Sequence, residues 1–132
     1  MEYLGTGEED QLTARGGAQG ITAYGFGADD LFDVAADNED VDITLRGGAG
    51  NDTIIVTAGN PSEIGWVGTA SIEGKYFGGL DNDTIEFGDG LAILQGSVKG
   101  NEGDDTITVA RADGGFINGG SENDIISLGF AD

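Results

Sequence analysis

The sequence predicts an all-β fold, a parallel β-solenoid of about six turns that forms a single domain over residues 1–132. Three observations favour it. A ten-residue segment recurs along the chain, each copy of its loop is followed by residues that are apolar at every second place, and the chain has 26 glycines. A segment that recurs about every 20 residues is typical of architectures in which each copy forms one coil and stacked coils share a core.

The recurring segment is clearest at 47–56, where a glycine-rich, acidic loop runs directly into an apolar segment. The copies begin 20, 22, 31, 22 and 19 residues apart. The first place of every copy is glycine: Gly5, Gly25, Gly47, Gly78, Gly100 and Gly119. The sixth place of every copy is aspartate: Asp10, Asp30, Asp52, Asp83, Asp105 and Asp124. Because equivalent residues stack in a coil of constant period, these aspartates are predicted to form a column along one edge.

Apolar residues flank each loop on both sides. The eighth place is large and apolar: Leu12, Phe32, Ile54, Ile85, Ile107 and Ile126. The tenth place is also apolar: Ala14, Val34, Val56, Phe87, Val109 and Leu128. Two places before each first glycine stand Tyr3, Ala23, Leu45, Tyr76, Val98 and Ile117. Since side chains alternate between the two faces of a strand, these three columns are predicted to form one stacked core.

Taken in order along the chain, each turn is predicted to contain an acidic loop, a strand, a return turn and a second strand. The first two return turns are predicted at 15–20 and 35–40. The second strands, which bring the chain back to the next loop, are predicted at 21–24, 41–45, 71–77, 91–99 and 116–118.

The third turn is longer than its neighbours by roughly ten residues, and the extra residues lie at about 57–70. This segment contains Pro61 and Trp66, the only proline and the only tryptophan of the chain. Insertions in repeat proteins lie on one face and often form a binding face. The alternative is an inert surface loop in which Trp66 folds onto the coil as a lid.

Composition excludes several classes of function. The chain has 25 acidic and 5 basic residues, a net charge of −20. Nucleic-acid binding is not expected because it needs Lys and Arg to neutralise phosphates, and no apolar run is long enough for membrane insertion. Without His or Cys, the usual zinc sites and the His- or Cys-based nucleophiles are excluded, and we expect no enzymatic activity. Oxygen ligands remain, and these suit calcium.

A column of aspartates is repulsive unless something lies between the charges. Two unit charges 4 Å apart repel by about 1 kcal/mol in water and by about 4 kcal/mol at an effective dielectric constant near 20. Calcium binds about six to eight oxygens and accepts carboxylates and backbone carbonyls alike, so a cation between successive loops would turn repulsion into attraction. The alternatives are a metal-free solenoid whose aspartates only form turns, and a Greek-key sandwich.

Residues 47–55 fit the pattern G-G-x-G-x-D-x-apolar-x, and nearly the whole chain resembles the RTX (repeats-in-toxin, haemolysin-type) family of calcium-binding parallel β-rolls. The resemblance implies several Ca²⁺ ions, up to about five, between the stacked loops. It implies that the six aspartates and the carbonyl groups of the glycine-rich loops, including the first-place glycines, are the ligands. The fourth place, usually glycine in the family, is acidic at Glu8, Asp81 and Glu122. These acids either add ligands, with Asp81 and Glu122 as the candidates, or alter the turns. The return turns lack the motif, so we expect the ions mainly on one edge.

The function that we expect is a non-catalytic, calcium-stabilised structural module of an extracellular surface assembly, which serves decoration, adhesion or stabilisation. Solenoids normally have polar caps, whereas this sequence begins and ends within its repeats. We therefore expect either a piece of a longer protein or ends that partner subunits, including stacked copies of itself, cover. No export signal is evident at either end. One alternative is therefore a phage capsid decoration protein, which lysis would release and which would act on the virion surface. The expected localisation is extracellular, on a cell surface or on a virion.

The other alternative is an accessory carbohydrate-binding calcium module of a secreted enzyme. Its candidate contacts are Tyr24, Phe77 and Trp66. Arg46 and Lys99 occupy the same place of the repeat as Tyr24, Phe77 and Asn118, so these side chains are predicted to share one outward stripe. Catalysis on acidic polysaccharides is not expected, because it needs a basic groove and the chain has only 5 basic residues.

Overall fold

The computed structural model describes residues 2–15, 18–35, 41–57, 70–87, 92–94, 96–112 and 115–131. Every regular element in this part of the chain is a β-strand, and every strand pair is parallel. The predicted all-β, parallel fold is therefore confirmed.

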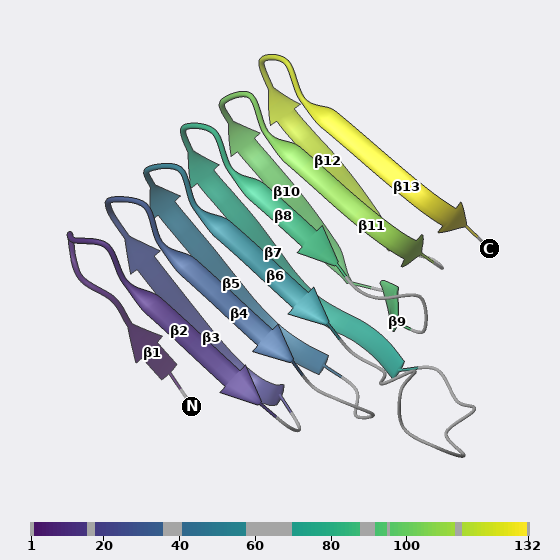
Figure 1. Cartoon of the computed structure of the whole chain (residues 1–132), viewed down its shortest axis with the longest axis horizontal. Coiled ribbons are helices and arrows are strands. Elements are labelled where there is room, and N and C mark those ends of the chain that lie inside the picture. Colours follow the sequence, from purple (N-terminus) through teal and green to yellow (C-terminus); the bar gives the residue numbers. More distant parts are fainter. Residues whose placement is uncertain are drawn as a thin grey trace.

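The strands form two stacks, one in front of the other in Figure 1. The first stack pairs in the order β1 (Glu2–Leu4), β3 (Ala18–Phe26), β5 (Val41–Ala49), β7 (Ala70–Leu80), β10 (Ser97–Glu102) and β12 (Phe116–Ser121). The second stack pairs in the order β2 (Gln11–Arg15), β4 (Leu31–Ala35), β6 (Thr53–Thr57), β8 (Thr84–Phe87), β11 (Thr106–Ala112) and β13 (Ile125–Ala131).

The chain passes from the first stack to the second at one edge, where the acidic loops lie side by side (Figure 1). Parallel pairing of strands that alternate between two stacks is the topology of a β-solenoid, which the repeat predicted. Arg15 and residues 18–20 of the return turn predicted at 15–20 belong to β2 and β3, and Ala35 of the turn predicted at 35–40 belongs to β4, so these strands extend further than the sequence predicted. The rest of these return turns, and most of the insertion at 57–70 with Trp66, lie outside the described residues. The count of about six turns therefore stays a prediction.

The strand register confirms the predicted columns. In the first stack, Tyr3, Ala23, Leu45, Tyr76, Val98 and Ile117 are successive partners. In the second stack, the eighth-place residues from Leu12 to Ile126 are successive partners, and so are the tenth-place residues from Ala14 to Leu128. Spacing along the sequence alone was enough to set this register, because a slip by one residue would turn each apolar side chain away from the core.

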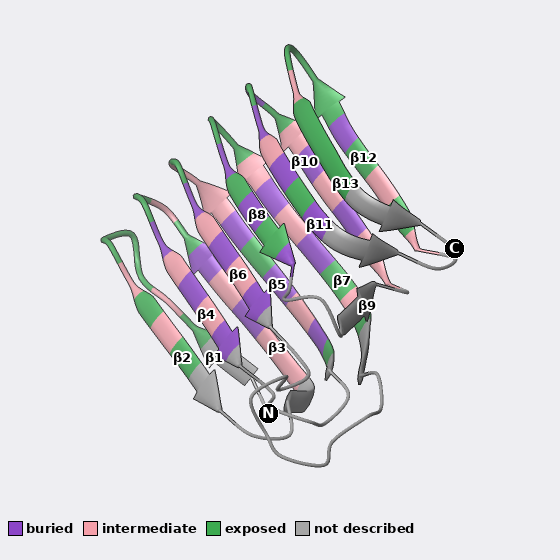
Figure 2. Cartoon of the chain, turned by 45° about the vertical axis from the view of Figure 1, so that its right-hand side comes forward, coloured by how far each residue is buried: buried purple, intermediate pink, exposed green. Residues whose placement is uncertain are grey.

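The hydrophobic core lies between the two stacks and consists mainly of these columns. Its buried members are Ala23, Phe32, Val34, Ile43, Leu45, Ile54, Val56, Tyr76, Ile85, Phe87, Val98, Ile107 and Val109. Tyr76 of the first stack meets Phe87 of the second edge-to-face, with ring centroids 4.8 Å apart, and its hydroxyl donates a hydrogen bond of 2.7 Å to the carbonyl oxygen of Glu73. Buried segments therefore recur at matching heights on neighbouring strands (Figure 2).

The return strand predicted at 91–99 is divided into β9 (Ala92–Leu94) and β10. β9 pairs with the start of β7 and also contacts β11, whereas β10 pairs with the end of β7. The ladder is interrupted where Gly96 approaches Gly74, whose φ is +98°. A Cβ on Gly96 would lie only 2.6 Å from the carbonyl oxygen of Gly74, so two glycines allow this close approach.

β13 ends the second stack, and its large apolar side chains are exposed: Ile125 by 61 %, Ile126 by 47 % and Leu128 by 46 %. The columns of Ile126 and Leu128 are fully buried further back along the stack, at Ile107 and Val109, whereas Ile125 is the register partner of Thr106, which is half-buried. Figure 2 shows the change from buried to exposed between β11 and β13. Within the part of the chain that the structure describes, no helix is long and apolar enough to span a membrane.

Candidate metal centre

The predicted aspartate column exists and is held together by hydrogen bonds between neighbouring loops. The backbone N–H of each aspartate donates to the Oδ1 atom of the aspartate in the next loop. The distances are 2.8 Å from Asp10 to Asp30, Asp30 to Asp52, Asp52 to Asp83 and Asp83 to Asp105, and 3.0 Å from Asp105 to Asp124. The carboxylates from Asp30 to Asp124 therefore point back towards the preceding loop, and the four interior aspartates serve as both donor and acceptor.

The backbone carbonyls of the aspartates continue the same column. Each accepts a hydrogen bond from the N–H of the residue that follows the next aspartate, as in Thr53 to Asp30 and Thr84 to Asp52, both at 2.8 Å. These bonds begin the second strand stack immediately after each loop. The loop edge and the parallel ladder are therefore one continuous hydrogen-bonded structure.

The second carboxylate oxygen is different. Asp30, Asp52, Asp83 and Asp105 are buried, and among the described residues their Oδ2 atoms have no hydrogen-bond partner. An unpaired buried carboxylate oxygen is costly, because it has lost water and gained no donor in return. Four such atoms recur at equivalent places of one column, and a proton or a cation is the kind of partner that satisfies a buried carboxylate oxygen.

The pKa values of the four buried aspartates also show that their negative charge is costly without a partner. Burial raises the pKa of all four carboxyl groups, and repulsion between neighbouring aspartates adds to this, although the N–H donor to each Oδ1 works in the opposite direction. The pKa of Asp52 rises to about 7 and that of Asp83 to about 8. Without a cation, the carboxyl groups in the middle of the column therefore bind protons more readily than exposed carboxyl groups do.

Glycine is required at the first place of each loop because a side chain there would collide with the aspartate Oδ2 atom. A Cβ on Gly47 would collide with Asp52 Oδ2 and would lie 2.6 Å from the carbonyl oxygen of Gly78. The same carboxylate contact recurs at the first-place glycine of each loop. The bare Cα therefore lets a carboxylate oxygen of one loop and a carbonyl oxygen of the next face a common space. Carboxylate and carbonyl oxygens are the ligands that calcium takes.

The glycine-rich turns share one backbone conformation from the second loop to the sixth. Their second and fourth places have positive φ: Phe26 and Ala28, Gly48 and Gly50, Gly79 and Asp81, Asn101 and Gly103, and Gly120 and Glu122. The non-glycine residues at the fourth place thus keep the turn of Gly50 and Gly103 rather than altering it. Positive φ costs an ordinary L-residue about 1–2 kcal/mol, so these positions are tolerated rather than preferred.

The first loop departs from this conformation. Neither Thr6 nor Glu8 has a positive φ, although the structure describes both. Instead, the N–H of Thr6 donates to Asp10 Oδ2 at 2.5 Å, and the Thr6 hydroxyl lies 3.3 Å from the same atom. The Thr6 hydroxyl also accepts a bond of 3.0 Å from the N–H of Glu8. The oxygen that lacks a partner in the interior loops is thus satisfied here by the loop itself.

A second ladder runs beside the aspartates and was not assigned from the sequence. From the second loop to the sixth, the fifth-place side chain accepts from the fifth-place N–H in the next loop: Asn51 to Asp29, Asn82 to Asn51 and Asp104 to Asn82 at 2.9 Å, and Asn123 to Asp104 at 3.0 Å. At the fifth place the N–H donates to the preceding loop, whereas at the sixth place it donates to the following loop. The signal was present, because every fifth-place residue carries a side-chain oxygen.

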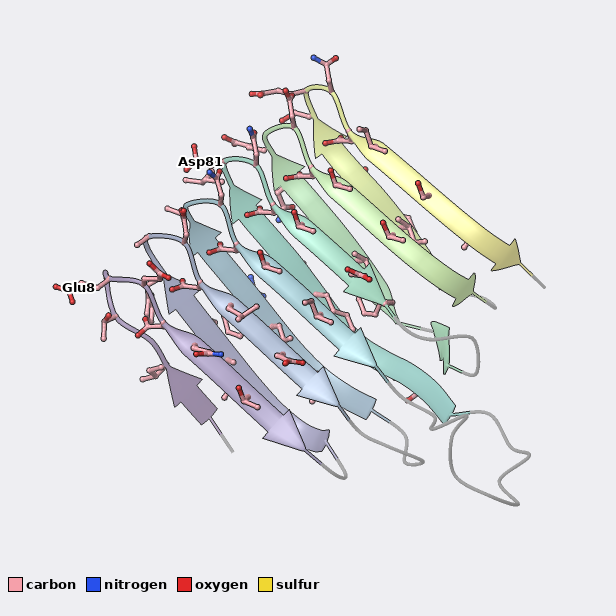
Figure 3. All side chains as sticks on the ribbon, viewed as in Figure 1. Glu8 and Asp81 are labelled. Atoms are coloured by element: carbon pink, nitrogen blue, oxygen red, sulfur yellow. The ribbon has the colours of Figure 1, made fainter. Side chains whose placement is uncertain are left out.

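Asp81 and Glu122, the other candidate ligands, lie on the exposed side of the loops. Asp81 accepts a hydrogen bond of 3.1 Å from the N–H of Gly50, and both acids line an open hollow of about 270 Å³. Figure 3 shows Glu8 and Asp81 projecting outwards from the loop edge. Among the described residues, no group of three or more acidic side chains converges on one point. A cation in the column would therefore be held by few carboxylates and by backbone carbonyls.

Fold and loop edge together define a β-solenoid repeat protein with a hydrogen-bonded aspartate column. Comparisons of the chain with protein-family models, curated proteins and solved structures found no match. The resemblance to RTX β-rolls therefore rests on the repeat motif of the chain itself.

Proposed function

We propose that the chain is a non-catalytic structural module of the RTX β-roll type, with about six turns, which calcium stabilises by binding along the aspartate column. The observation that supports this most directly is the set of buried, unpaired Oδ2 atoms of Asp30, Asp52, Asp83 and Asp105. The donor set fits calcium, since it consists of oxygens alone and combines carboxylates with carbonyls. When bound, the ions would supply positive charge between loops that otherwise repel one another.

The sites that we propose are not all alike. The four interior aspartates with unpaired Oδ2 atoms are the strongest candidates. Asp10 is the weakest, because Thr6 already donates to its Oδ2 atom. Asp81 and Glu122 would act as outer ligands or as screening charge, since both are exposed. The upper limit is about five ions, because six stacked loops leave five spaces between neighbours.

Calcium dependence supports a location outside the cell. Extracellular calcium modules have dissociation constants of about 10⁻⁴–10⁻³ M. At about 100 times the dissociation constant, a bound ion stabilises the folded state by about 2.7 kcal/mol, and at far lower concentrations it contributes almost nothing. The proposed module would thus be rigid outside a cell and soft in a compartment that is poor in calcium.

A role in an assembly is supported by the apolar surface of β13. Ile125, Ile126 and Leu128 are each nearly half exposed or more, and exposed apolar patches commonly mark contact sites. We propose that another protein subunit, a stacked copy or a further part of the same protein covers this strand. The assembly would lie on the surface of a cell or of a virion.

The test compares thermal melts followed by circular dichroism in EDTA and across a calcium titration to about 10 mM. We expect a large rise in melting temperature with calcium and a smaller rise with magnesium, which demands a stricter geometry. In Asp52→Asn, the side chain keeps an oxygen for the N–H of Asp30 but loses its charge. This variant should melt higher than the natural sequence in EDTA and should gain less from calcium.

The matched control is Glu86→Gln, which removes the same charge from an exposed position on β8. It should leave the calcium response unchanged. Identical melts with and without calcium for the natural sequence would show that the aspartates are turn-forming residues only, and the calcium module would then be rejected.

A further inference from the structure

A groove crosses the outer side of the first stack next to the loop edge. It has a volume of about 240 Å³, and its floor contains Gly48 and Gly79. These glycines are register partners, and Phe26 and Asn101 continue the same column on either side of them. Two glycines between two larger side chains leave a hollow. Its size is below that of pockets for drug-sized ligands, about 300–1,000 Å³, and suits a single ring.

One wall of the groove is aromatic. Tyr24 and Phe26 stack with ring centroids 6.0 Å apart and an interplanar angle of 21°. Phe26 has a φ of +80° and is 52 % exposed. Positive φ is an outlier for a bulky residue, and the equivalent places of the other loops with this turn hold glycine or asparagine, which adopt it at lower cost. The turn of the repeat sets this φ, but neither the turn nor the packing of the core explains why the place holds an exposed phenylalanine, and residues held at such φ values cluster at functional sites.

The other wall carries a cation. The Arg46 guanidinium lies 4.4 Å from the centroid of the Phe77 ring, and among the described residues Arg46 forms no ion pair. A cationic ligand would be repelled by Arg46 at the groove itself. A polyanionic ligand would be repelled by the whole chain, whose net charge is −20. Charge therefore favours a neutral ligand that can accept hydrogen bonds from a guanidinium and pack against an aromatic face.

We propose that this groove binds a ring of a neutral oligosaccharide. The apolar C–H face of the sugar would pack against Phe26 and Tyr24. Its hydroxyl groups would bond with Arg46 and Asn101. Gly47 and Gly78 border both this groove and the aspartate column, but sugar binding does not require that the column binds calcium.

The test is an NMR titration of the ¹⁵N-labelled chain with three neutral hexasaccharides, of α-1,4-glucose, β-1,4-glucose and β-1,4-N-acetylglucosamine. At least one should shift the amide signals of Gly48, Gly79 and Asn101. Phe26→Asn introduces the residue that stands at position 101 with a φ of +86°, so this variant should fold at least as stably. The affinity of this variant for the sugar should be lower by at least about tenfold. Leu80→Asn removes an exposed apolar side chain outside the groove and should leave the affinity unchanged.

Several results would overturn this assignment. One is the absence of shifts with all three neutral sugars at millimolar concentration, and another is binding that survives Phe26→Asn. A preference for oligogalacturonate, which is acidic, would contradict the charge argument. Sedimentation that reveals self-association dependent on Phe26 would assign the groove to a second copy instead. The melts of Asp52→Asn test the calcium proposal, and these titrations test the sugar proposal. Rejection of one proposal therefore does not reject the other.

Discussion

The N–H of Asp52 donates to Asp83 Oδ1 across 2.8 Å, although 31 residues separate the two. The bonds from Asp30 to Asp52 and from Asp83 to Asp105 have the same length over 22 residues. The longer third turn therefore does not open a gap in the column. Insertions in a solenoid are tolerated in this way when the extra chain leaves the stacked positions in register.

Stability without calcium is expected to fall as the pH rises. Burial raises the pKa of Asp52 to about 7 and that of Asp83 to about 8, from 3.8. Between pH 3.8 and about 8, the folded state binds more protons than the unfolded state, so the free energy of unfolding decreases with pH across this window. Thermal melts in EDTA at pH 5, 6, 7 and 8 should show a falling melting temperature, and calcium should flatten the trend.

The control for this dependence is Asp83→Asn, which removes the group with the higher pKa and should reduce the slope. The high net charge also destabilises the chain as the pH rises, so the difference in slope is the informative quantity. An equal slope in both proteins would contradict a buried, proton-binding Asp83.

Thr6 is expected to stabilise the first loop. Thr6→Ala removes the hydroxyl that accepts from the N–H of Glu8 and lies near Asp10 Oδ2. The loss of one such bond lowers the free energy of unfolding by about 0.5–1.5 kcal/mol, which urea denaturation can resolve. Thr6→Ser keeps the hydroxyl and should cost less. Equal losses in both variants would assign the effect to the Thr6 methyl group rather than to the hydrogen bonds.

The shared turn conformation predicts opposite effects for two substitutions at the fourth place. Ala28 has a φ of +67°, so Ala28→Gly relieves about 1–2 kcal/mol of backbone strain and adds about 0.4–1 kcal/mol of unfolded-state entropy. We expect a net gain of about 0.5–1 kcal/mol. Gly50→Ala should instead cost at least about 2 kcal/mol, because its φ is +114° and its Cβ would collide with the carbonyl oxygen of Ala28. Chemical denaturation measures the change in the free energy of unfolding for each variant. Changes of the same sign in both variants would disprove the shared turn conformation.

The fifth-place ladder predicts a role for Asn51 that is independent of calcium. Its Oδ1 atom accepts from the N–H of Asn82 at 2.9 Å. Asn51→Ala should lower the free energy of unfolding by about 0.5–1 kcal/mol, equally in EDTA and in calcium. Asn51→Asp keeps the acceptor and should retain most of the stability. A loss seen only with calcium would mean that Asn51 contributes to a metal site instead.

Several features followed from the sequence by itself: the parallel solenoid, its register, the core columns and the aspartate column. These depend on the repeat spacing and on alternation along the strands, both of which are local properties that can be read along one chain. The outward stripe that joins Tyr24, Arg46, Phe77 and Lys99 was predicted on the same grounds, and the register confirms it.

Other features were decided only by the tertiary structure. That the Oδ2 atoms of Asp30, Asp52, Asp83 and Asp105 are buried without a donor depends on the loops on both sides of each aspartate. The exception at Asp10 depends on the bond from Thr6, and the groove depends on Gly48 and Gly79 meeting Phe26 across neighbouring strands. Residues distant in sequence produce these properties together, because burial and hydrogen bonding are relations between neighbours in space. A repeat fixes which residues stack, whereas the stacked atoms themselves decide which groups remain unpaired.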